Sequence, residues 1–182
     1  MKKYEWECNE NQLNAMKMYT LDYQSYINSY FRLNPHPFEK ISIYGVNLTY
    51  DEFLNLCNEL DKICSINKLF DDTILYRGIK SNDTIERYIK NKMFPEKGFC
   101  STSFDKDIAI EKATIQDENK NFNDFGWVME IYAPNGTQGV YLHKYSASPI
   151  EQEFLLPRNI NFKIFNVDKD RRILKVIDNK YL

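Results

Sequence analysis

Residues 146–159 read SASPIEQEFLLPRN, and two glutamates stand where a segment of small residues turns into an apolar run. We expect EQEFLLP, residues 151–157, to form a strand. Side chains alternate between the faces of a strand, so Glu151 and Glu153 should point the same way while Gln152 points oppositely. Their Cα atoms would lie about 6.6 Å apart, at roughly 3.3 Å per residue. Such a pair can act on a sugar-type bond through an oxocarbenium-like transition state, and two solvated charges on an edge strand are the alternative.

The segment LYRG, residues 75–78, places an arginine and a glycine side by side within the predicted strand TILYRGI. Arg77 could hold a phosphate or a carboxylate bidentately. Gly78 would let a ligand approach the backbone closely. An ordinary surface arginine is the alternative, since most arginines are exposed.

The segment STS, residues 101–103, lies within a second predicted strand, GFCSTSF. Ser101 and Ser103 should share one face of that strand, with Thr102 on the other. Serine hydroxyls can orient a carboxylate by hydrogen bonding. Ser103 could also cap the helix expected to follow, and the two uses are compatible.

Composition limits the possible classes of protein. The 182 residues suit one domain, residues 1–182, whose core should be rich in rings because the chain has 13 Tyr and 12 Phe. A formal net charge of -2 without a polybasic tail does not favour binding to nucleic acid. We find no secretory signal and no apolar run long enough for a membrane span. These features predict a protein that is cytoplasmic where it is made, or delivered into a target or host cell.

The cysteines and histidines argue against a metal site. The four cysteines form no CxxC pair, and the chain has only two histidines. We therefore expect no metal, and four free, mostly buried thiols.

The periodicity divides the chain into a mainly helical part, residues 1–70, and a β-rich part, residues 71–182. Apolar residues three and four apart predict a helix over 10–33 and another from Thr49 or Asp51 to about Leu69. The expected later elements are strands over 73–79, 98–104, 127–133, 139–143, 151–157, 161–167 and 171–177, and helices over 82–92 and 105–113, the latter capped by Ser103 or Asp105. The fold class is therefore α+β, with N-terminal helices followed by mostly antiparallel sheet.

The three motifs, in the order LYRG, FCSTSF and EQEFLLPRN, resemble the arginine–serine–glutamate class of mono-ADP-ribosyltransferases. This class includes bacterial binary toxins, single-chain exoenzymes and arginine-specific ectoenzymes. The segment YTLDYQSYINSYFR, residues 19–32, is similar to the N-terminal helices of the bacterial toxin branch. The resemblance covers roughly residues 10–165. It implies the ADP-ribosyltransferase fold, with two roughly perpendicular, mainly antiparallel sheets around an NAD cleft and the N-terminal helices alongside.

The resemblance also implies a role for each motif residue. Arg77 would bind the NAD phosphates and shape the nicotinamide pocket. Ser101 would hydrogen-bond the catalytic glutamate and help to fix NAD, while Ser103 supports the strand. Glu153 would contact the nicotinamide ribose and stabilise the oxocarbenium ion, and Glu151 would face the acceptor.

Further contacts are implied less directly. Gly78 and Thr102 would complete the NAD site. The loop HKYSASPI, residues 143–150, would recognise the target protein through Tyr145. Phe122 and Phe125 are the candidates for an aromatic ring that stacks on nicotinamide. The tyrosines of the first helix are expected to pack in the core, although the family places residues of this helix over the NAD cleft.

The resemblance predicts an NAD-dependent enzyme that transfers ADP-ribose to an arginine of a target protein and releases nicotinamide. A glutamate at the first ExE position favours arginine over other acceptors. Two alternatives remain, an NAD glycohydrolase and a catalytically inactive binding protein with the same fold. The target is open, and so is the setting: a secreted effector, a phage-encoded modifier or the enzymatic part of a multipart toxin.

Overall fold

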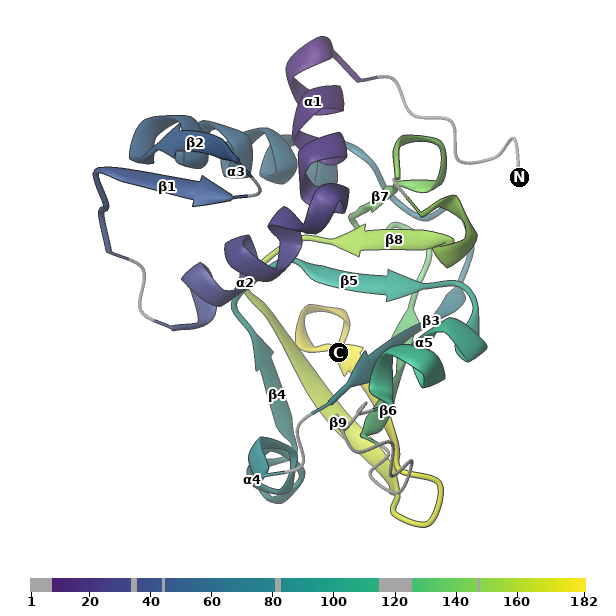
Figure 1. Ribbon diagram of the computed structural model, residues 1–182. Coiled ribbons are helices and arrows are strands. Elements are labelled where there is room, and N and C mark those ends of the chain that lie inside the picture. The colour runs from purple at the N-terminus through teal and green to yellow at the C-terminus, as the bar shows by residue number, and fades with distance from the viewer. Residues whose placement is uncertain (1–7, 34–35, 44, 81–82, 115–125, 147) are drawn as a thin grey trace.

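The computed structural model describes residues 8–33, 36–43, 45–80, 83–114, 126–146 and 148–182 (Figure 1). The N-terminal part begins with α1 (Glu10–Met18), a π-helical turn (Tyr19–Tyr23) and α2 (Gln24–Arg32). The helix expected over residues 10–33 is therefore confirmed, with a wider turn in its middle. Asn9 and Gln12 form a capping box that fixes the start of α1.

The second helix, α3 (Tyr50–Ile66), begins at the position that the sequence indicates. Thr49 is its N-cap and forms a capping box with Glu52. The helix ends at Ile66 rather than near Leu69. It packs against α1, and a two-stranded antiparallel hairpin of β1 (Lys40–Ile43) and β2 (Val46–Thr49), which the sequence analysis missed, precedes it.

The main sheet has eight strands in the order β4-β9-β10-β6-β3-β5-β8-β7. The strands of the sheet are β3 (Thr73–Ile79), β4 (Met93–Glu96), β5 (Cys100–Ser103), β6 (Trp127–Ala133), β7 (Val140–Tyr141), β8 (Glu153–Leu156), β9 (Ile160–Asp168) and β10 (Ile173–Asp178). All pairs are antiparallel except β6 with β10, so the sheet is mixed but mostly antiparallel. Two helices, α4 (Asp83–Asn91) and α5 (Lys106–Ala113), lie between strands in the sequence.

The expectation of two large sheets needs correction, because the second sheet is only the β1–β2 hairpin. The change of direction occurs inside the main sheet, where β5 and β8 run across the direction of β3, β6 and β9 (Figure 1). The pairing of β3 with β5 consists of one residue pair, Tyr76 with Ser103. One pair keeps the sheet continuous while the strands on either side diverge.

The strands predicted from the sequence are present, but several are shorter than expected. β7 covers only two residues, and β8 begins at Glu153 rather than Glu151. β4 was missed because Pro95 stands within it. This position is compatible with proline because β4 is an edge strand of the sheet.

The core is built largely from aromatic rings, as the composition predicts. Its largest fully buried side chains include Tyr19, Phe53, Phe99, Phe154 and Phe162. Cys57, Cys64 and Cys100 are buried and Cys8 is half-buried, all as free thiols, which confirms that expectation. None of the helices in the described ranges combines the length and apolar character that crossing a bilayer requires.

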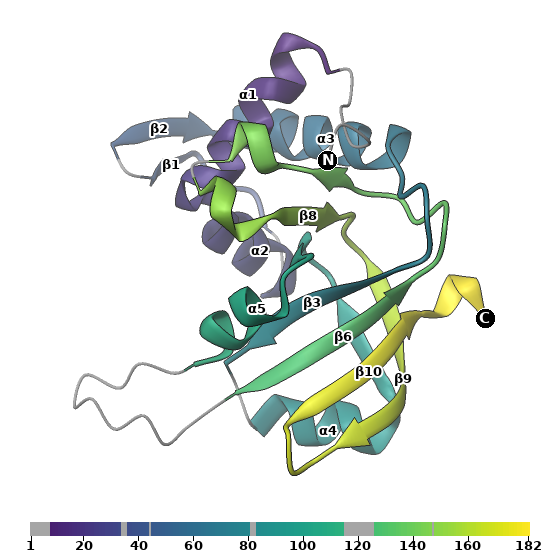
Figure 2. The same cartoon turned by 90° about the vertical axis from the view of Figure 1, so that its right-hand side faces the viewer.

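The glycine of LYRG has a packing role. A Cβ atom at Gly78 would lie 2.3 Å from the carbonyl oxygen of Ala109 and 2.5 Å from the nitrogen of Ala113. Both are backbone atoms of α5, which lies directly on β3 (Figure 2). The predicted close approach at Gly78 is therefore made by the helix backbone.

We expect Gly78→Ala to destabilise the fold, because α5 would have to move away from β3. Overpacking of this kind typically costs about 1–3 kcal/mol, and here the neighbour is rigid backbone. Urea denaturation should show a larger loss of unfolding free energy than for Gly136→Ala, where a Cβ meets no atom within 4 Å but φ is +86°. A smaller loss for Gly78→Ala than for this control would contradict the packing role.

Candidate active site

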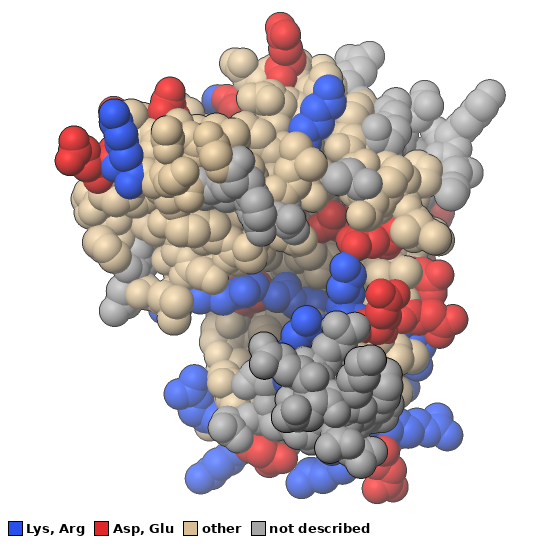
Figure 3. Space-filling model, viewed as in Figure 1, with Lys and Arg blue, Asp and Glu red and all other residues tan. Residues whose placement is uncertain are grey.

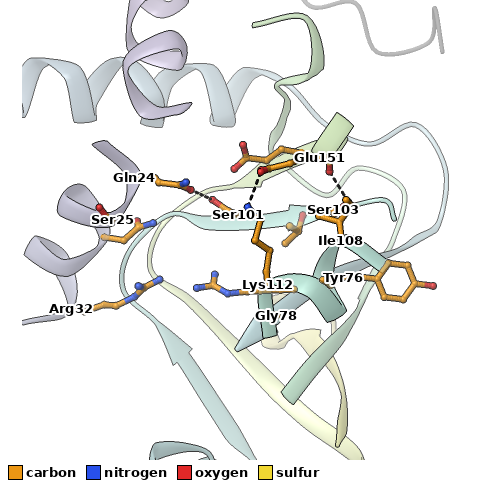
Figure 4. A pocket seen from close by; sticks show the side chains of 15 residues that line it. Gln24, Ser25, Arg32, Tyr76, Gly78, Ser101, Ser103, Ile108, Lys112 and Glu151 are labelled. Atoms are coloured by element: carbon orange, nitrogen blue, oxygen red, sulfur yellow. Dashed lines mark hydrogen bonds and ion pairs between the residues drawn. The ribbon is translucent and has the colours of Figure 1, made fainter. Parts of the chain in front are cut away.

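The three sequence motifs meet at one pocket of about 290 Å³ at the bend of the main sheet (Figure 4). Its walls come from α2, β3, β5, α5 and the turn before β8. The predicted site residues that line it are Arg77, Gly78, Ser101, Thr102, Ser103, Glu151 and Glu153. Segments that lie far apart in the sequence thus converge as the motif order suggested.

Glu153 is a buried carboxylate without full hydrogen bonding. Its residue is 6% exposed, and Oε1 has no hydrogen-bond partner. Burial raises the pKa of Glu153 to about 7, with a further rise from Glu151, whereas the Ser101 hydroxyl and the Lys112 ammonium act in the opposite direction. The pocket therefore holds a carboxylate that changes charge near neutral pH.

Glu151 lies on a turn, which corrects the prediction that both glutamates stand on one strand. Residues Pro149–Glu151 form a 3₁₀ turn, and Gln152 has a left-handed backbone with φ of 46°. The turn interrupts the alternation of a strand, yet both carboxylates line the same pocket. The Glu151 side chain is 26% exposed, and its Oε1 lies 2.7 Å from Lys112 Nζ (Figure 4).

Ser101 connects the N-terminal helices to the pocket. Its hydroxyl lies 3.0 Å from the hydroxyl of Tyr19 and donates a long hydrogen bond of 3.5 Å to Gln24 Oε1. Tyr19 belongs to the π-helical turn and is fully buried, and π-turns often occur at functional sites. Asn28 Nδ2 donates to the Tyr19 hydroxyl at 3.0 Å, so α2 and β5 share one polar network.

The other two residues of STS form hydrogen bonds to the backbone of neighbouring segments. Thr102 Oγ1 donates to the carbonyl of Phe154 on β8. Ser103 Oγ donates to the Glu151 carbonyl at 2.7 Å and accepts from the backbone nitrogen of Asp105, the N-cap of α5, at 2.9 Å. Ser103 thus supports both the turn that carries Glu151 and the start of the next helix.

Arg77 is fixed by a residue that the sequence analysis did not identify. Glu96, which is 3% exposed, forms an ion pair with Arg77 Nη2 at 2.9 Å and accepts hydrogen bonds from Arg32 at 2.9 and 2.7 Å. Arg32 and Arg77 both line the pocket and an adjoining cleft of about 890 Å³. Arg32 is the last residue of the toxin-like segment 19–32, so the sequence resemblance could have identified it. The segment around Glu96, MFPEKG, matches no motif that could have identified that residue.

Basic side chains gather in this part of the molecule, beside the two glutamates of the pocket. Figure 3 shows Lys and Arg side chains gathered in a hollow across the middle of one face. Arg32, Arg77 and Lys112 line the pocket. A concave basic surface favours an anionic ligand.

Unsatisfied polar atoms also gather here. Within the described part of the chain, the buried side-chain nitrogen and oxygen atoms that lack a hydrogen-bond partner are Asn28 Oδ1, Arg77 Nη1 and Glu153 Oε1. All three residues line the same pocket. Such atoms usually cost about 1–3 kcal/mol each, so their concentration indicates a site prepared for a polar ligand.

Tyr145, predicted to contact the target protein, does not line the pocket. Tyr145 lies in the 3₁₀ turn His143–Tyr145, half-buried against the core. Phe122 and Phe125 lie outside the described residues. Where the structure describes the chain, no group of three or more potential ligands is arranged to hold a metal ion.

Solved structures that align with this chain include bacterial ADP-ribosyltransferases. The structure of an ADP-ribosyltransferase from Clostridium botulinum aligns with a TM-score of 0.68 and 22% identity, over 97% of this chain and 89% of that one. C3stau2 from S. aureus with NAD aligns with a TM-score of 0.66 and 17% identity, over 94% and 88% of the two chains. The fold is therefore the ADP-ribosyltransferase fold.

The sequence then assigns the family. The chain belongs to the ADP-ribosyltransferase exoenzyme family, whose model matches residues 1–182. It is also 34% identical, over 158 residues, to NAD(+)--arginine ADP-ribosyltransferase EFV of Enterococcus faecalis (strain ATCC 700802 / V583). This match covers 86% of the chain but 29% of the relative, so the chain spans less than a third of that protein's length. The resemblance inferred from the three motifs is confirmed.

Glu153→Gln should change how stability depends on pH. The folded protein keeps the Glu153 proton up to about pH 7, whereas the reference carboxyl loses it near 4.5. Between these values the folded state binds more protons, so rising pH lowers the stability of the wild type, by on the order of 3 kcal/mol at about 1.4 kcal/mol per pKa unit.

Urea denaturation of the ligand-free protein measures this effect. The unfolding free energy of Glu153→Gln, relative to that of the wild type, should increase from pH 5 to pH 8. Glu130→Gln, which removes a carboxylate paired with Lys106 outside the pocket, should show no such gain. A difference between Glu153→Gln and wild type that stays constant with pH would contradict the raised pKa.

Proposed function

We propose that this chain transfers ADP-ribose from NAD to an arginine side chain of a target protein and releases nicotinamide. The observation that carries the proposal is the convergence of three unpartnered buried polar atoms, on Asn28, Arg77 and Glu153, in one basic pocket with Glu151 at its mouth. Membership of the exoenzyme family and the arginine specificity in the name of the E. faecalis relative support it.

The bond to nicotinamide breaks first in this scheme. Its electron pair goes to the ring nitrogen, so the pyridinium becomes neutral nicotinamide and no general acid is required. Positive charge develops on the ribose, and in this scheme the carboxylate of Glu153, which is 6% exposed and so largely shielded from water, lies beside it. A fixed anion in such a site stabilises the developing charge without reorganisation. Ser101, which lowers the pKa of Glu153, favours its ionised form.

The acceptor arginine then forms the new bond from a guanidinium nitrogen to the ribose carbon. A protonated guanidinium is a poor nucleophile, but its donors match a carboxylate. Glu151 is partly exposed at the pocket mouth, so it can hold the arginine and take one proton, which passes to solvent. Tyr145 remains our candidate for contact with the target protein, and Phe122 or Phe125 for stacking on nicotinamide.

The diphosphate of NAD would lie between Arg32 and Arg77. Both arginines line the pocket and the adjoining cleft, so a dinucleotide could extend from one into the other. Arg77 Nη1 has no partner inside the protein, while Glu96 holds the rest of its guanidinium in place. Gly78, Thr102 and Ser103 would serve the NAD site mainly by supporting its walls.

The central experiment separates the two glutamates. The protein is incubated with NAD and agmatine, a small guanidinium acceptor, and nicotinamide release and agmatine labelling are followed by mass spectrometry. Glu153→Gln should lower both rates at least 100-fold, because the anion beside the ribose is lost. Glu151→Gln should abolish labelling while sparing part of the nicotinamide release, and Glu130→Gln should leave both unchanged.

Other outcomes discriminate among the functions. Nicotinamide release without labelling of agmatine or of lysate proteins by the wild type would point to a glycohydrolase. Labelling of asparagine, cysteine or nucleic acid in place of arginine would contradict the acceptor. A wild type that neither binds nor cleaves NAD would be a binding protein with an inactive site.

Arg32→Lys should raise the KM for NAD about 10-fold or more with a smaller change in kcat. Lysine keeps the positive charge but cannot reproduce the forked contact with Glu96 and a phosphate at once. Arg171→Lys, at an exposed site in the turn between β9 and β10, is the matched control. Equal KM values for the two variants would remove Arg32 from the NAD site.

A further inference from the structure

Lys112 is a pocket residue that the sequence motifs did not suggest. It lies in α5, whose backbone can pack directly on β3 because Gly78 has no side chain. The side chain reaches across the pocket mouth, and Nζ lies 2.7 Å from Oε1 of Glu151 (Figure 4). The carboxylate that we assign to the acceptor therefore already carries a cation from the protein itself.

We propose that Lys112 stands in for the acceptor arginine, occupying Glu151 until a target guanidinium displaces it and thereby favouring arginine over water as the acceptor. This inference rests on the proposed function, because it concerns the acceptor side of the same site. It adds a residue that determines which nucleophile reacts.

The exposure of the pair makes such an exchange easy. The Lys112 side chain is 52% exposed and that of Glu151 is 26% exposed, so the contact lies at the surface of the pocket. Ion pairs of this kind contribute about 0–1 kcal/mol. An incoming guanidinium brings the same charge and a two-pronged set of donors, which fits a carboxylate better than an ammonium does.

Water, unlike a guanidinium, brings no positive charge to replace that of Lys112. To use Oε1 of Glu151 as a base, a water molecule would have to replace Lys112 without supplying a positive charge. The hydrogen bond to Glu151 raises the pKa of Lys112, so the ammonium remains charged at neutral pH. Target-independent hydrolysis of NAD is therefore restrained while the arginine acceptor is admitted.

The same helix provides a matched control. Lys106 Nζ lies 2.8 Å from Glu130 Oε1, and its side chain is 40% exposed. The distance within this pair matches that of Lys112–Glu151, although Glu130 is 12% exposed and also lies 3.8 Å from Lys175. Neither Lys106 nor Glu130 lines the pocket. Effects that arise only from losing an ion pair on α5 should appear equally in Lys112→Met and Lys106→Met.

Steady-state kinetics with NAD and agmatine test the proposal. Lys112→Met should raise NAD hydrolysis in the absence of acceptor several-fold and lower the KM for agmatine by up to about 5-fold, the value of an exposed ion pair. Both effects should vanish in the Glu151→Gln background, and Lys106→Met should show neither. Unchanged hydrolysis and agmatine KM would reduce Lys112–Glu151 to a surface ion pair. A raised KM for NAD as the main effect would make Lys112 a ligand of NAD instead.

Agmatine binding, followed by NMR titration without NAD, keeps this test apart from the proposed function. Lys112→Met should bind agmatine more tightly than the wild type, and Glu151→Gln should bind it more weakly. If the wild type fails to cleave NAD, the enzymatic proposal is wrong, yet these affinities still decide whether Lys112 competes with a guanidinium. Equal affinities in wild type and Lys112→Met would overturn the competition.

Discussion

A buried carboxylate between two arginines holds the parts of this molecule together. Glu96 lies in β4 and bonds to Arg32 at the end of α2, to Arg77 in β3 and to the backbone nitrogen of Gly98. A charge that is 3% exposed is tolerable only with such full pairing, and removal of one partner from a buried pair typically costs about 3–5 kcal/mol. The N-terminal helices, the central strand and the edge strand are thereby held in one arrangement, and the basic pocket lies at their junction.

Several buried polar atoms in the pocket lack hydrogen-bond partners. The ion pair with Glu96 fixes the Arg77 guanidinium but leaves Nη1 without a partner, and Asn28 and Glu153 each carry a further unpartnered atom. Burial raises the pKa of Glu153 for the same reason, since nothing in the ligand-free protein fully compensates its charge. Stability is therefore lower than the fold could provide, and a ligand that supplies donors and acceptors in this pocket would recover part of it.

Local sequence signals predicted the elements well, because their causes are local. The capping boxes at Asn9 and Thr49 start two helices, and the strand Thr73–Ile79 has its predicted bounds. Contacts across the sheet could not be predicted, because strand order is not written in any short segment. The partner of Arg77 was missed for that reason. The packing of Gly78 against α5 was missed for the same reason, because α5 is a long-range neighbour of the strand that carries Gly78.

The two glutamates of the ExE motif line one pocket, but not on the single strand that the sequence predicts. A uniform strand would place Glu151 and Glu153 in equivalent environments. The left-handed Gln152 separates them instead, so one carboxylate lies at the start of a buried strand and the other on an exposed turn. The two carboxylates therefore have different surroundings: Glu153 is buried and its Oε1 has no hydrogen-bond partner, while Glu151 is 26% exposed and paired with Lys112. The division that we propose between a bond-breaking and an acceptor-holding glutamate thus depends on the left-handed backbone of the residue between them.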